Sequence, residues 1–73
     1  MTDEQGAALE LAFDSAFNAL GMDSYEGVYV PTKKALAVFD GPQQIGNVAS
    51  TVGEAGRLLA TAIRVKFRLA YSE

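Results

Sequence analysis

Strict alternation between residues 57 and 71 is the feature that most constrains how this chain can fold. A strand turns every second side chain to the same face, so this pattern predicts a half-buried strand over 57–71. A helix is the alternative, but it would gather Leu59 and Ile63 on one side and place Lys66 among them. The strand is favoured because most of the alternating residues are strand formers. They are Leu59, Thr61, Ile63, Val65, Phe67, Leu69 and Tyr71.

The first twenty residues carry the pattern of an amphipathic helix, expected at about 3–20. Thr2 and Gln5 match the capping box, in which each side chain pairs with the other residue's backbone N–H. Gly21 can take the left-handed conformation that ends helices, whereas Gly6 weakens the first turns and predicts a late start. The apolar stripe consists of Leu9, Phe13, Ala16, Phe17 and Leu20.

Two β-prone segments follow, and they predict a hairpin of strands at about 25–30 and 35–39. Pro31 cannot donate a ladder hydrogen bond and marks the end of the first strand. Apolar residues occupy both faces of the second strand, which indicates burial on both sides. Residues 43–56 predict a loose loop with a weak strand at about 47–52, ordered mainly by neighbouring subunits.

Length and composition bound the fold class. Seventy-three residues make one domain, 1–73, and a domain of this size buries only about 60% of its unfolded surface. No cysteine is present to staple it, so an oligomer or partner is expected. We therefore expect a mainly β domain with one N-terminal α-helix, as a small antiparallel sheet or partly open β-barrel. Its expected core is Phe13, Phe17, Val38, Phe39, Ile63, Val65 and Phe67.

The net charge of −3 hides an uneven distribution. Six of the nine acids lie in residues 1–26, and four of the six bases lie in residues 57–68. On a strand, the last three bases would point to one face about 6.6 Å apart. This row could contact carboxylates of a protein partner, contact nucleic-acid phosphates, or protect a strand edge. The candidate partner interface is Arg57, Arg64, Lys66 and Arg68.

Catalytic and cofactor-binding patterns are missing from the sequence. It has no histidine, so no serine has the usual base to activate it. Glu10 and Asp14 stand one helical turn apart, a spacing typical of a solvated helix face. The glycines match no phosphate-binding pattern. We expect no enzyme, no cofactor, no metal, no membrane span and no secretory signal.

Four segments in order resemble the small head–tail joining (head-completion or neck) proteins of tailed phages and prophages. They are FDSAFNALG, MDSYEGVYVP, ALAVFDGP and VASTVGEAGRLLATAIRVKF, within residues 11–67. The resemblance implies a β-barrel-like fold, no catalysis, and a ring between portal and tail. Family members usually continue with further strands, so this chain resembles a shortened member whose open sheet neighbouring subunits complete.

The expected function is therefore a structural virion protein that joins phage head to tail in a neck ring. The expected partners are other copies of the chain and neighbouring portal, neck or tail proteins, assembled in the host cytoplasm. One alternative is another phage structural role, such as head decoration or a tail adaptor. The other is a small nucleic-acid-binding module that uses the basic row, although the acidic balance argues against it.

Overall fold

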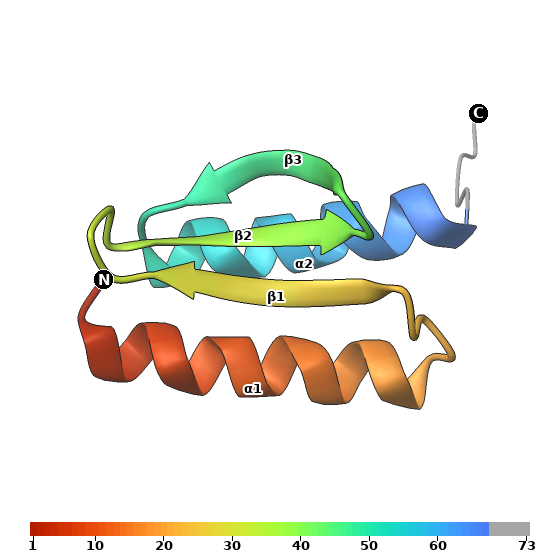
Figure 1. The fold of residues 1–73 in the computed structure, drawn as a ribbon, viewed down its shortest axis with the longest axis horizontal. Coiled ribbons are helices and arrows are strands. Elements are labelled where there is room, and N and C mark those ends of the chain that lie inside the picture. Colours follow the sequence, from red (N-terminus) through yellow and green to blue (C-terminus); the bar gives the residue numbers. More distant parts are fainter. Residues whose placement is uncertain (68–73) are drawn as a thin grey trace.

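A computed structural model describes residues 1–67 and shows an α+β fold (Figure 1). Over these residues the order is α1 (Asp3–Ala19), β1 (Tyr25–Val30), β2 (Ala35–Asp40), β3 (Gln43–Ala49) and α2 (Val52–Phe67). The strands form an antiparallel sheet in the order β1-β2-β3. The expectation of a mainly β fold is wrong, because a second helix occupies most of the predicted long strand.

Helix α1 begins as its cap predicts. The Gln5 N–H donates to Thr2 Oγ1 over 3.1 Å, and the Thr2 N–H donates to Gln5 Oε1 over 3.0 Å. Gly21 follows the helix with φ 73°. The late start expected from Gly6 is wrong, since Gly6 lies inside the helix and is buried against the ring of Tyr29.

Helix α2 replaces the strand expected over 57–71, and residues 68–71 of that range lie outside the described residues. The Glu54 N–H donates to Thr51 Oγ1 over 3.1 Å, while Glu54 Oε1 accepts from the Ser50 N–H over 2.9 Å. Thr51-x-x-Glu54 is thus a helix start that the alternation concealed. The buried stripe of α2 runs at helical spacing through Ala55, Leu58 and Ala62.

Lys66 follows Ala62 at helical spacing, but its side chain is exposed. Its Nζ lies 5.7 Å from the centre of the Tyr25 ring, so the cation faces an aromatic ring at the edge of the core. The small residue that lets α2 approach β3 closely is Gly46, on β3 itself. A Cβ at Gly46 would lie 3.1 Å from Leu58 Cδ1.

The core lies between one face of the sheet and both helices. Phe13 and Phe17 stand edge to face 6.0 Å apart, and Phe17 meets Tyr25 in the same way at 5.6 Å. Met22, Leu36 and Val38 are also fully buried there. Three predicted core residues, Phe13, Phe17 and Val38, belong to this core, and Ile63 packs at its margin.

The remaining predicted core residues, Phe39, Val65 and Phe67, do not belong to this core. Phe39 points to the opposite face of the sheet, because it alternates with Val38. Val65 and Phe67 are 49% and 46% exposed, because a helix separates them from the stripe that faces the core. The strand expected at 47–52 is β3 at Gln43–Ala49, and residues 43–56 carry regular structure within the single chain.

Candidate protein interface

One face of the sheet carries no helix, and it is apolar apart from Glu26 and Gln44, which pair with Phe39. Cross-strand register places Val28 beside Ala37 and Val30 beside Ala35. The intervening residues point to the helices: a Cβ at Gly27 would lie 3.0 Å from Phe13 Cβ, and Leu36 lies in the core. Figure 1 shows α2 passing behind the sheet and no helix in front of it. We call Val28, Val30, Ala35, Ala37 and Phe39 the open sheet face.

The composition of the open sheet face is unusual for a surface that meets water. An antiparallel sheet with one solvated face normally alternates apolar and polar residues. Here Val28, Val30 and Phe39 are half-buried, and Ala35 and Ala37 are each only 4% exposed. The sequence predicted burial on both sides of β2, and this is confirmed for Ala35, Leu36, Ala37 and Val38, which are all buried.

The outer edge of β1 is closed by helix α1. The Gly27 N–H donates to Asp14 Oδ1 over 2.9 Å, and the Tyr29 N–H donates to Glu10 Oε1 over 3.1 Å. The Tyr25 N–H donates to the Met22 carbonyl over 3.0 Å. The prediction that Glu10 and Asp14 form a solvated helix face is therefore wrong, because both carboxylates accept hydrogen bonds from β1. They occupy the backbone donors through which another strand would pair.

The outer edge of β3 is interrupted by a bulge. Ile45 pairs with Val38 and Ala49 pairs with Leu36, so Gly46–Val48 lies opposite Ala37 alone. Gly46 takes φ 69°, a conformation that favours glycine, and Val48 is exposed. Bulges of this kind bend an edge strand and hinder pairing with another chain. Pairing of another strand is therefore hindered at both edges of the sheet, whereas no helix covers the open sheet face.

An open groove of about 310 Å³ lies between the bulge and α2. Glu54 and Arg57, of opposite charge, stand one helical turn apart along it. A groove of mixed charge and small side chains offers contacts to another protein surface, but no arrangement for catalysis. Its lining is Gly46, Asn47, Val48, Glu54, Arg57, Leu58 and Thr61.

The predicted row of basic side chains does not form. Arg57 and Arg64 lie on one side of α2, seven residues and about 10 Å apart along the axis. Lys66 points instead to the Tyr25 ring. Arg68 lies outside the described residues. A strand would have aligned these bases, whereas a helix divides them between different sides.

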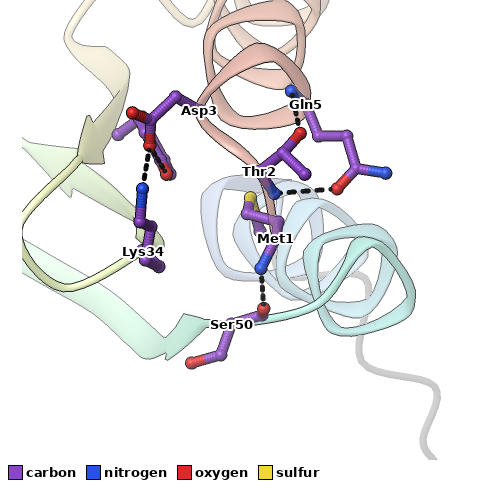
Figure 2. Close-up of polar contacts among 7 residues, drawn as sticks. Met1, Thr2, Asp3, Gln5, Lys34 and Ser50 are labelled. Atoms are coloured by element: carbon purple, nitrogen blue, oxygen red, sulfur yellow. Dashed lines mark hydrogen bonds and ion pairs between the residues drawn. The ribbon is translucent and has the colours of Figure 1, made fainter.

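A polar cluster joins the start of α1 to the hairpin of β1 and β2 (Figure 2). The Asp3 carboxylate accepts from the Tyr29 hydroxyl over 2.6 Å and from Lys34 Nζ over 2.7 Å. The hydrogen bond from Lys34, and then that from Tyr29, hold the pKa of Asp3 below its usual range. The same carboxylate, followed by burial, raises the pKa of Tyr29 to about 12. In the same view the Met1 amino group donates to the Ser50 carbonyl over 2.8 Å.

The role of this polar cluster is to hold α1 against the hairpin. The pKa of its tyrosine, Tyr29, is raised, so the hydroxyl stays protonated at neutral pH. An activated nucleophile or base would require a lowered pKa. Over residues 1–67, no three acidic, cysteine or histidine side chains gather in a way that could hold a metal ion. No helix among these residues combines the length and apolarity needed to cross a membrane.

Sequence reasoning found part of the open sheet face and missed how the edges are protected. The signal for the face was present, because β2 is apolar on both sides. The bond from Gly27 to Asp14 left no local signal, since it joins residues 13 positions apart. Comparison of this chain with protein-family models, curated proteins and solved structures finds no match.

Proposed function

We propose that this protein is a non-catalytic structural subunit that self-associates by burying its open sheet face against another copy of the chain. The observation that carries the proposal is a sheet face without a helix, on which Val28, Val30 and Phe39 remain partly exposed, between two edges that do not invite strand pairing. Contiguous apolar surface on a small domain commonly marks a protein-binding site. A domain with so small a core also gains stability when an oligomer buries more surface.

The head–tail neck of a tailed phage is the setting we propose for this subunit, on the strength of the resemblance within residues 11–67. The barrel that the resemblance implied is not the fold of this chain, so the support rests on segment order and on the surface. A virion location and neighbouring portal or tail proteins belong to the same proposal. Head decoration and a tail adaptor are its alternatives.

Sedimentation equilibrium between about 1 μM and about 1 mM tests self-association. Val28→Lys places a charge in the middle of the face, and we expect it to weaken association by more than about tenfold. Leu11→Lys is the matched control, because Leu11 is 70% exposed on α1, and it should associate as the natural protein does. Val28→Thr, which keeps the side-chain shape, should give a smaller loss.

A thermal melt of each variant confirms that the subunit remains folded. A natural protein that stays monomeric throughout this range contradicts the proposal. Association that Val28→Lys leaves unchanged contradicts it as well, because the contact would then lie elsewhere.

A further inference from the structure

We infer that the pair Asp40-Gly41 is a site of spontaneous isoaspartate formation, which the folded chain holds unreacted. An aspartate is most prone to this change when glycine follows it, because no side chain then hinders the attacking nitrogen. The pair lies where β2 turns into β3, with Asp40 half-buried and Gly41 exposed. The site is present whether or not the protein self-associates.

The reaction needs water as its only co-reactant. The Gly41 nitrogen loses its proton and bonds to the side-chain carboxyl carbon, Cγ, of Asp40, while a C–O bond breaks and one water molecule leaves. The product is a succinimide ring. A second water molecule then opens the ring. Attack at Cγ restores aspartate, whereas attack at the backbone carbonyl carbon leaves isoaspartate, with the main chain running through the former side chain.

The attacking nitrogen is engaged in the folded chain. The Gly41 N–H donates to the Ser24 carbonyl over 3.1 Å, which ties the β2–β3 turn to the residue before β1. Figure 1 shows the start of β1 and the end of β2 at the same end of the sheet. A paired backbone donor leaves its acceptor when the segment opens locally, so the reaction has to start from an opened state.

The carbon that is attacked belongs to a side chain placed beside a different neighbour. Asp40 pairs directly with Tyr25, so the two side chains stand on the same face of the sheet. Burial first, and then the charge of the Asp40 carboxylate, raise the pKa of Tyr25, as expected for close neighbours. Ring closure requires this carboxyl group to turn back towards its own following peptide bond. The two atoms that must join are therefore each placed by a different contact.

The turn both requires the glycine and suffers from the product. Gly41 takes φ 61°, a conformation that strains other residues, so a larger side chain at this position is disfavoured. Isoaspartate adds an atom to the main chain next to the pair of Asp40 with Gln43, which helps to set the register of β2 and β3. We expect the modified chain to melt at a lower temperature than the natural one.

Incubation of the full chain, folded and in urea, tests the inference. Chromatographic peptide mapping with mass spectrometry measures isoaspartate at Asp40, and the exposed Asp23, followed by Ser24, is the internal control. The folded chain should react at least about tenfold more slowly than the unfolded chain, because only the opened fraction reacts. In urea, Asp23 should react more slowly than Asp40, since the serine side chain hinders attack.

Two variants check the chemistry. Asp40→Asn forms the same ring with loss of ammonia instead of water, so it should react faster, and its hydrolysis is visible as a change of mass. Asp40→Glu keeps the charge but would need a larger ring, so it should give no product.

Hydrogen exchange at the Gly41 amide supplies the second measurement. Over a series of urea concentrations, the rate of isoaspartate formation should rise in parallel with this exchange. A Gly41 amide that exchanges freely in the folded chain overturns the inference, and so does a protected amide with isoaspartate formed as fast as in the unfolded chain. An unfolded chain that reacts no faster at Asp40 than at Asp23 overturns it as well. Rates that follow Gly41 exchange, with no product in Asp40→Glu, support it.

Discussion

At the scale of single residues, Gly6 occupies a helix position where a larger residue has no room. A Cβ there would overlap the ring of Tyr29, which is buried and held through its hydroxyl by Asp3. Helix propensity favours alanine over glycine by up to about 1 kcal/mol, but overpacking costs about 1–3 kcal/mol. Packing therefore decides the residue at this position.

We expect Gly6→Ala to lower the free energy of unfolding, measured by urea denaturation, by about 1–3 kcal/mol. Gly56→Ala is the matched control within α2, since nothing lies within 4 Å of a Cβ at that position. The control should raise stability by up to about 1 kcal/mol. A stabilising Gly6→Ala would show that Tyr29 does not pack as described.

Among residues 1–67, Tyr29 carries a clear pH dependence. Its pKa in the folded protein, about 12, lies above the ordinary value of 10.0. The unfolded chain therefore loses this proton first, and the stability that the bond contributes is complete below pH 10. It is lost as the pH rises towards about 12. Burial raises the pKa of Tyr25 as well, so that residue adds a loss in the same direction.

Removal of the Asp3 acceptor should distinguish the titration of Tyr29 from that of Tyr25. Asp3→Ala is expected to bring the pKa of Tyr29 back towards 10, followed by the ultraviolet absorbance of tyrosinate. Glu4→Ala removes the neighbouring acid of the same helical turn and should leave that titration unchanged. Equal titration curves for Asp3→Ala and the natural protein would contradict the assigned cause.

At the scale of secondary-structure elements, α1 serves β1 as a row of acceptors as well as a packing surface. Asp14→Ala leaves the Gly27 N–H without a partner and exposes a donor at the strand edge. We expect a loss of about 1–3 kcal/mol in urea denaturation and faster hydrogen exchange at Gly27. Asp14→Asn keeps an oxygen acceptor and should lose less.

Ser15→Ala is the control for that experiment, because it changes an exposed neighbour on the same helix. If Asp14→Ala matches this control in both stability and Gly27 exchange, α1 does not guard the edge.

Elements with strong local signals could be predicted from the sequence, and those with competing signals could not. Helix α1 has a capping box and a wide apolar stripe, and Pro31 marks the end of β1. Helix α2 has a cap at Thr51 and Glu54, but its apolar residues also alternate. Its buried stripe relies on alanines, whose spacing stands out less than that of Val65 and Phe67. Val65 and Phe67 fit an alternating pattern, so a strand was predicted where the structure has a helix.

The candidate site divides in the same way. The apolar residues on both sides of β2 could be recognised because burial of a strand leaves a local pattern. The bulge opposite Ala37 was missed because its one mark, the isolated Gly46, lies in a stretch that the sequence analysis assigned to a loop. The closure of the β1 edge depends on how α1 docks. Sequence spacing alone does not determine that docking.

At the scale of the whole molecule, the open sheet face is the side of the sheet that no helix of the described chain covers (Figure 1), although Leu11, Val48 and Val52 are exposed elsewhere. The β1 edge is occupied by Glu10 and Asp14, the β3 edge is bent by the bulge, and the helices cover the other sheet face. Association through the open sheet face adds apolar burial to a small core without opening either edge. Such an arrangement favours a defined pair over uncontrolled growth of the sheet.

An isotope-filtered nuclear Overhauser measurement on a mixture of labelled and unlabelled protein tests this account most directly. It should be recorded at a concentration where sedimentation gives a dimer mass. We predict intermolecular contacts from Val28 and Phe39 of the open sheet face, and none from Leu11 on α1. Intermolecular contacts that come from α1 or α2 and omit Val28 and Phe39 would contradict the account.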